Sequence, residues 1–236
     1  MKKCPTFLIA LGILWLIPRP ASAQVKTAAC GLRNLPLAAG NTWTYRSGSV
    51  DVTIRVLEVT AGKDAAGRPV TKISVEEKLH GRTHTTSMSC TTQGLSVPPD
   101  SFFFAGEPGG AVGGKFTETA REGVTWPQDA ALAPGISWVE KVKADQSGPH
   151  LAAHVEVERH VAVKGPEQVV SPLGRFTAQR VGFELRGRGV VKDQKQELPV
   201  KRPGTFWIAR GVGVLRVEDA FDRAWELVGT NLVPGR

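Results

Sequence analysis

The sequence predicts an all-β protein: an antiparallel, strongly curved sheet that forms a half-barrel or a sandwich from two similar meanders sharing one core. Three observations indicate this fold. Apolar and polar residues alternate with period two wherever the chain shows a pattern. The 26 glycines and 16 prolines supply the residues that many turns require. No window keeps the 3.6-residue period of a helix, and residues 219–227, the best helical candidate, fit a strand equally well.

Residues 1–23 have the three parts of a secretory signal peptide. Two lysines follow the initiator methionine, an apolar run covers residues 7–17, and small residues lead to a cleavage point at Ala23. The apolar run is shorter than the about 20 residues that a membrane-spanning helix needs. We therefore predict cleavage of this segment, no transmembrane segment, and a single mature domain (residues 24–236) in the periplasm or secreted.

The first half of the mature chain is typical of strands joined by hairpin turns. The alternating apolar face changes after Val56, where we predict a β-bulge. Strands are expected near residues 49–59, 71–79 and 83–90, with turns near 62–67 and 81–82.

The second half shows the same alternation. Valines alternate with charged residues over residues 154–163, and a similar pattern covers residues 183–188. Three closing strands are expected at residues 206–209, 213–218 and 224–232.

An internal echo indicates two pseudo-repeats, about residues 30–97 and 130–232. The pattern LAxGxxW ends at Trp43 in the first unit and at Trp138 in the second. A buried Trp on the first strand of each unit would anchor a shared core. A Gly/Pro-rich loop, residues 98–131, joins the units. The alternative is a chance likeness between two unrelated strand starts.

Three cysteines are present, and Cys4 would leave with the signal peptide. The remaining pair, Cys30 and Cys90, has neither CxxC spacing nor a neighbouring histidine. Two thiols in an exported protein usually pair. We therefore predict a structural Cys30–Cys90 disulfide.

The chain is basic, with a formal net charge of +8. Loss of the three basic residues within residues 1–23 would leave +5, and much of this excess lies in residues 175–216. Net charge concerns partners rather than fold. In an exported protein it favours lipid, lipopolysaccharide or acidic glycan as partners, and no nucleic acid.

The two ends of the mature chain resemble a known family. Residues 36–45 read PLAAGNTWTY and residues 205–216 read TFWIARGVGVLR. This resembles a family of bacterial exported β-rich proteins that start with PLxxGxxWxY and end with W-x-x-x-GVGxV. The resemblance implies a curved antiparallel sheet, loosely similar to the half-barrels of periplasmic lipoprotein carriers. It implies no activity, substrate or catalytic residue.

No strong catalytic or cofactor motif occurs: GxSxG, P-loop, HExxH, GxGxxG and Cys-rich metal spacings are absent. We assign no catalytic residue and no cofactor, and we do not expect an enzyme. One candidate metal site remains, formed by His154, Glu156 and His160, which alternate on one strand face and carry donors that suit zinc. The alternative is a solvated charged face behind a row of core valines.

Two groups are candidate ligand contacts. Arg186, Arg188 and Lys192 can lie on one strand face and contact an anionic headgroup or glycan. A solvated, charge-protected hairpin is the alternative. The triplet Phe102, Phe103 and Phe104 can cover an apolar ligand or enter a membrane, or it can plug the end of a β-structure.

The favoured function is a non-catalytic periplasmic or secreted binding protein, with an apolar or amphiphilic ligand in the concave face of the sheet. One alternative is a structural or protein-interaction module of the cell envelope, which a filled core without a pocket would favour. Another is a metal-dependent hydrolase using His154, Glu156 and His160.

Overall fold

The structure is a computed structural model that describes residues 29–106, 115–148, 152–192, 196–219 and 223–232. The predicted signal peptide lies outside these residues. Within them, 13 strands form one open antiparallel sheet in the order β6-β8-β9-β10-β11-β12-β13-β1-β2-β3-β4-β5-β7. Most neighbours in the sheet are also neighbours in the chain. The prediction of an all-β, curved antiparallel sheet is therefore confirmed.

The strands are β1 (Thr42–Ser47), β2 (Val50–Lys63), β3 (Pro69–Leu79), β4 (Arg82–Thr91), β5 (Gly94–Ser96), β6 (Lys115–Glu122), β7 (Trp126–Pro127), β8 (Ser137–Ser147), β9 (Ala152–Ser171), β10 (Gly174–Val191), β11 (Gln196–Ala209), β12 (Gly213–Glu218) and β13 (Ala224–Thr230). The short helices are η1 (Ala29–Gly31), α1 (Phe102–Ala105) and η3 (Asp129–Ala131).

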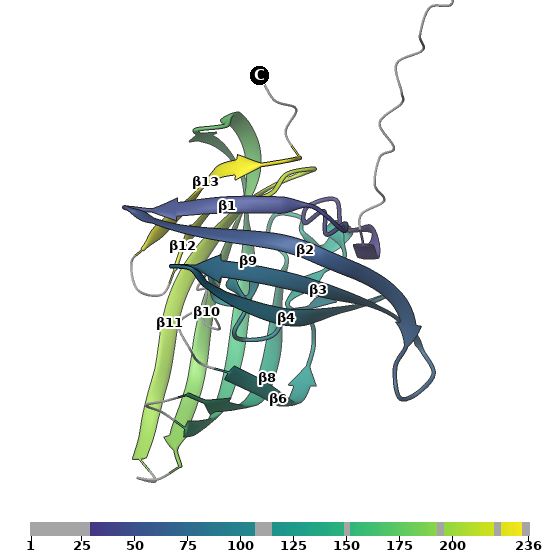
Figure 1. Ribbon diagram of the computed structural model, residues 1–236, viewed down its shortest axis with the longest axis vertical. Coiled ribbons are helices and arrows are strands. Elements are labelled where there is room, and N and C mark those ends of the chain that lie inside the picture. The colour runs from purple at the N-terminus through teal and green to yellow at the C-terminus, as the bar shows by residue number, and fades with distance from the viewer. Residues whose placement is uncertain (1–28, 107–114, 149–151, 193–195, 220–222, 233–236) are drawn as a thin grey trace, which may run out of the picture.

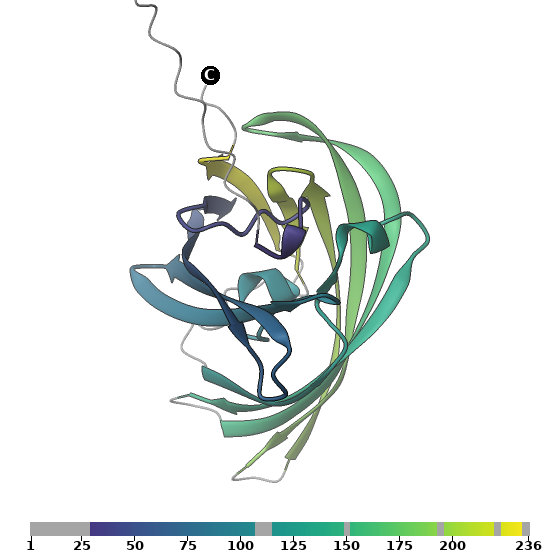
Figure 2. The same cartoon turned by 90° about the vertical axis from the view of Figure 1, so that its right-hand side faces the viewer.

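The long strands β9, β10 and β11, of 20, 18 and 14 residues, curve around one side of the molecule (Figure 1). Figure 2 shows the strands β1–β4 and the helix α1 inside this curve. A sheet so strongly twisted and coiled has a concave face, which must be filled, and an outer face, which meets solvent. One contiguous cluster of buried apolar residues fills the concave side, with members from both halves of the chain.

The two motifs that carry the family resemblance meet in this core. The indole N–H of Trp43 donates to the Val212 carbonyl at 2.7 Å, and the Tyr45 hydroxyl donates to the Val214 carbonyl at 3.0 Å. Gly213 has a φ of 99°, and a Cβ there would lie 3.1 Å from Trp43 Nε1. Glycine is favoured because a side chain would be strained at this positive φ and its Cβ would press against the indole.

The structure refines the predicted elements. The bulge predicted after Val56 lies between Val56 and Glu58. Strand β2 extends to Lys63, so the first hairpin turn is shorter than the predicted residues 62–67. The ambiguous segment 219–227 contains the start of β13 and no described helix. The origin of the two meanders as repeats stays a prediction.

Cys30 and Cys90 are disulfide-bonded and tie the N-terminal segment to β4, with Cα atoms 5.8 Å apart. The closed loop spans 60 residues. Replacement of both cysteines by alanine is expected to lower the free energy of unfolding by roughly 2–4 kcal/mol, because the unfolded chain gains entropy. Urea unfolding of both proteins tests this, and coinciding transitions would contradict it.

Candidate functional site

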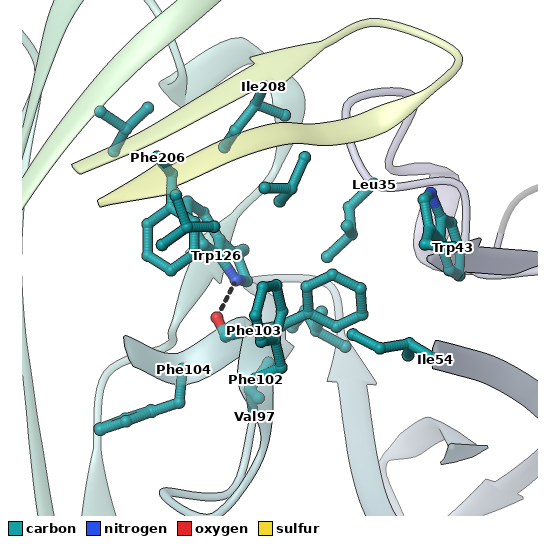
Figure 3. Packing of buried hydrophobic residues seen from close by; sticks show 14 of the residues in the cluster. Leu35, Trp43, Ile54, Val97, Phe102, Phe103, Phe104, Trp126, Phe206 and Ile208 are labelled. Carbon is teal, nitrogen blue, oxygen red and sulfur yellow. Dashed lines mark hydrogen bonds between the residues drawn. The ribbon is translucent and has the colours of Figure 1, made fainter. Parts of the chain in front are cut away.

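The predicted aromatic contact, Phe102–Phe104, forms α1 inside the curved sheet (Figure 3). These side chains are only 0%, 0% and 2% exposed. The Phe102 ring stacks on Tyr45 with ring centroids 4.6 Å apart, and the indole N–H of Trp126 donates to the Phe103 carbonyl at 3.0 Å. The rings therefore fill the concave face as core. The geometry favours the plug over an exposed ligand contact.

The concave face leaves little open space around these rings. A hollow lined by Leu32, Leu35, Trp126 and Ile208, among others, measures about 10 Å³. Such a volume has room for about one water molecule. An apolar ligand on this face would have to displace the Phe102–Phe104 rings.

A buried carboxyl group holds the start of α1. Oε1 of Glu77, on β3, accepts hydrogen bonds from Ser101 Oγ at 2.6 Å and from the Phe102 N–H at 2.8 Å. Complete burial raises the pKa of Glu77 to about 8, and the nearby Asp100 carboxylate adds to the increase. Asp100 lies 3.1 Å from His84 Nε2, without hydrogen-bond alignment. Glu77 is therefore mainly protonated at neutral pH.

A second ionisable group, Arg159, is buried beside Phe104 of α1. The Arg159 guanidinium lies 4.9–5.9 Å from the ring centroids of Phe104, Trp126, Phe183 and Phe206. Its Nη1 donates to the Thr125 carbonyl at 2.9 Å, while Nε and Nη2 have no hydrogen-bond partner in the described part of the chain. Burial lowers the pKa of Arg159 to about 9.

Glu140 is the cross-strand neighbour of Arg159 and is also fully buried. Its Oε1 accepts from Thr125 Oγ1 at 2.7 Å and from Arg121. The interior therefore holds Arg121, Glu140 and Arg159 in one polar group between β6, β8 and β9. Because Glu140 and Arg159 are fully buried and the Arg121 side chain is only 10% exposed, this group supports the fold rather than offering a ligand surface.

The outer face of β8, β9 and β10 carries ordered charges. The strand registers place Lys141, Glu158 and Arg186 side by side, and they place Lys143, Glu156 and Arg188 side by side two residues further along. We call these six residues the charged rows. In each row a carboxylate on the middle strand lies between a lysine on β8 and an arginine on β10.

Ion pairs connect the charged rows across the strands. Glu156 lies 2.9 Å from Lys143 Nζ and 3.4 Å from Arg188 Nη2, and Glu158 lies 3.3 Å from Lys141 Nζ. The hydrogen bond from Lys143 lowers the pKa of Glu156, and that from Lys141 lowers the pKa of Glu158. Both carboxylates are therefore ionised at neutral pH. The six side chains remain 31–58% exposed.

Two recesses adjoin on this outer face. The first, of 560 Å³, is lined by residues that include His160, Lys164, Glu184 and Arg186. Its floor contains the small residues Ala162 and Gly182, which are cross-strand neighbours. The second, of 580 Å³, is lined by all six residues of the charged rows together with Glu122, Val142, Val157 and Gly187. Because Arg186 lines both recesses, they form one extended surface that carries charged side chains.

The structure brings together only part of the predicted basic group. Arg186 and Arg188 belong to the charged rows. Lys192 lies just beyond the end of β10, 3.2 Å from Asp145, and lines neither recess.

The candidate metal ligands His154, Glu156 and His160 share the outer face of β9. His154 lies 3.7 Å from Glu156 through Nε2 and 3.3 Å from Asp145 through Nδ1, whereas His160 Nε2 lies 3.1 Å from Glu158. Within the described residues, no three His, Cys, Asp or Glu side chains are grouped to hold a metal ion. The metal site stays a prediction.

The sequence analysis missed Lys141 and Lys143. The segment V-E-K-V-K-A in β8 alternates lysines with buried residues, and this pattern was the available signal. Which strand pairs with β8 is not visible in the sequence. Their place beside Glu158 and Glu156 therefore comes from the structure alone.

The chain was compared with known proteins. No family model and no curated protein matches it. A solved structure from Bacteroides fragilis, described as an exported protein with a YmcC-like fold, has a TM-score of 0.52 and 14% sequence identity, over 84% of this chain and 98% of that one. A structure from Parabacteroides distasonis, described as a lipoprotein, has a TM-score of 0.55 with the same identity and coverage.

At 14% identity these similarities concern the fold. The chain has a curved antiparallel sheet of the same kind as these two proteins. Across the described ranges, no helix is long and apolar enough to cross a membrane.

Proposed function

We propose that this protein is an exported, non-catalytic binding protein that holds an acidic glycan on the outer face of its large sheet. Export to the periplasm or beyond is supported by the signal-peptide pattern of residues 1–23 and by the Cys30–Cys90 disulfide. The descriptions of the two similar structures, as an exported protein and a lipoprotein, agree with it.

The observation that carries this proposal is the junction of the two recesses at Arg186. Each recess, at 560 and 580 Å³, lies within the about 300–1,000 Å³ of small-ligand sites. The adjacent strands β8, β9 and β10 supply most of the lining side chains, and Glu122 of β6 adds one. Strand-borne side chains hold their positions better than those of loops, so the surface is ordered before a ligand arrives.

The chemistry of the recesses fits a ligand that carries both hydroxyl and carboxylate groups. Arg186 and the lysines of β8 donate hydrogen bonds to carboxylate and hydroxyl oxygens. Glu156 and Glu158 accept hydrogen bonds from hydroxyl groups. An acidic glycan presents both kinds of group along one chain. Charged residues form most of the lining of the second recess, and the first is also lined by Trp138 and Val139, which can pack against the apolar face of a sugar ring.

The test is binding of the mature protein to immobilised polygalacturonate, with neutral dextran as the comparison. Arg186→Ala is expected to weaken binding to polygalacturonate about tenfold, because a charge-assisted contact is worth about 1.5–3 kcal/mol. Arg82→Ala is the matched control, since Arg82 is an exposed arginine on β4, outside both recesses. It is expected to bind as the wild type does.

Equal losses in both variants, or equal binding to dextran, would reject the proposal.

Lipid retained in native mass spectra of the protein from its host would instead support an apolar ligand in the concave face. The filled concave core favours a second candidate, a protein-interaction module of the envelope. Capture of one envelope protein in place of glycan, abolished by Arg186→Ala, would support that candidate.

A further inference from the structure

We infer that Glu156 and Glu158 are specificity-determining residues, which exclude densely charged polyanions from the charged rows while admitting a sparsely charged acidic glycan. The inference rests on the proposed function, because it concerns the same outer face. It assigns these two carboxylates a role that ion pairing alone does not give them.

The carboxylates lie in the middle of the cationic surface. Adjacent strands are about 4.8 Å apart, and alternate residues on one strand are about 6–7 Å apart. Glu156 contacts cations on both flanking strands, Lys143 at 2.9 Å and Arg188 at 3.4 Å. An anionic group that binds a cation of either row therefore comes within a few ångströms of a fixed negative charge.

The cations outnumber the carboxylates on this surface. On β11, Lys201 lies next to Arg186 and extends that row, so five cations lie around Glu156, Glu158 and Glu184, and Glu184 pairs with Arg186 and Lys201. Without Glu156 and Glu158, the four cations of β8 and β10 would form one basic patch, with Glu184 at its edge, of the kind that binds polyanions without selectivity. With them, the four cations of β8 and β10 form two separate lines along the strands.

Ligand charge density decides what this arrangement admits. A polyphosphate or nucleic acid carries a charge on every unit, so charges crossing from one line to the other must pass over Glu156 or Glu158. The screening length of about 8 Å at physiological salt exceeds these separations, so the repulsion is not screened out. An acidic glycan can place its carboxylates over the cations and its hydroxyls over the two glutamates.

The test uses the double variant Glu156→Gln/Glu158→Gln, which keeps side-chain shape and an acceptor oxygen but removes both charges. Binding of inorganic polyphosphate and of polygalacturonate is measured by titration calorimetry at fixed salt. The variant is expected to bind polyphosphate at least about tenfold more tightly than the wild type. Its affinity for polygalacturonate is expected to change less than about threefold.

The matched control is Glu58→Gln/Glu76→Gln, which removes the same charge from exposed or half-exposed positions on β2 and β3. An equal gain of polyphosphate binding in both double variants would show an effect of net charge and would overturn the inference. The inference would also be overturned if Glu156→Gln/Glu158→Gln bound polyphosphate no more tightly than the wild type. If the wild type binds no polygalacturonate while the first variant still gains polyphosphate binding, the proposed ligand is rejected and the exclusion of dense polyanions stands.

Discussion

Glu77→Gln is expected to stabilise the protein by up to about 5 kcal/mol at alkaline pH and to change its stability little near about pH 5. Glu77 is fully buried, and burial raises its pKa from 4.5 to about 8. Ionisation places an uncompensated charge beside Asp100 in the core. Glutamine keeps the Oε1 acceptor for Ser101 Oγ and the Phe102 N–H and cannot ionise.

The sign of this pH dependence of stability follows from proton linkage. In the unfolded chain Glu77 ionises near its ordinary pKa, whereas in the folded protein it stays protonated up to about pH 8. The folded state therefore binds more protons between these two values, and the stability contributed by Glu77 is lost as the pH rises through this window. Below about pH 4 the full contribution is present. Above about pH 9 the loss is complete.

Urea unfolding of wild type and variant, at about pH 5 and about pH 9 with the disulfide intact, measures this effect. The neighbouring Glu76→Gln is the matched control, because Glu76 is half-exposed on the other face of β3. Other titrating groups change the stability of wild type and variant alike, so the difference reports Glu77. A difference that stays constant between the two pH values would show that Glu77 has an ordinary pKa.

Arg159→Ala is expected to lower the free energy of unfolding by about 4–5 kcal/mol. The substitution removes a fully buried side chain that packs against four aromatic rings, and it leaves a cavity beside Phe104 and Trp126. It also removes the hydrogen bond to the Thr125 carbonyl. The loop before β7 and the α1 plug should loosen together, since both contact this guanidinium.

Arg159→Met separates packing from charge. Methionine refills the space between the rings and removes the Nε and Nη2 donors that lack hydrogen-bond partners. A well-packed apolar residue can replace a buried ion without loss. Arg159→Met is therefore expected to stay within about 1 kcal/mol of the wild type. Unfolding curves of the three proteins test this, and equal destabilisation by Ala and Met would show that the charge itself is required.

The sequence predicts much of the fold because alternation is local. Val155, Val157, Val161 and Val163 mark one face of β9, and the structure packs all four against the core. The change of phase after Val56 marks the bulge for the same reason. Each of these features depends on a few neighbouring residues, so a single sequence contains it.

The same local pattern contains buried charges that were overlooked. Glu77 is in phase with Ile73, Val75 and Leu79, and Arg159 is in phase with the valines of β9, so each lies on an apolar face. A charge in phase with core residues is unusual, because burial is costly without partners. The partners come from distant segments, around Ser101 and Thr125, and only the structure shows them.

The candidate site likewise has residues that the sequence indicates and an arrangement that only the structure shows. Glu156, Arg186 and Arg188 were named from the sequence, since alternation places each on an outer face. That they form rows with Lys141, Lys143 and Glu158 depends on the register between β8, β9 and β10. Register is set by the turn and the side-chain packing of each strand pair, and alternation alone does not specify it.

By itself the sequence predicted the all-β class and, with Cys4 assigned to the predicted signal peptide, the Cys30–Cys90 pairing, because these follow from local periodicity and from a count of two remaining thiols. Only the tertiary structure decided that Phe102–Phe104 fill the concave face and that the outer face holds the recesses. The physical reason is that an apolar triplet has the same sequence whether it lines a ligand site or fills a core. The strands that pack over the triplet come from distant parts of the chain, so only the tertiary structure shows them.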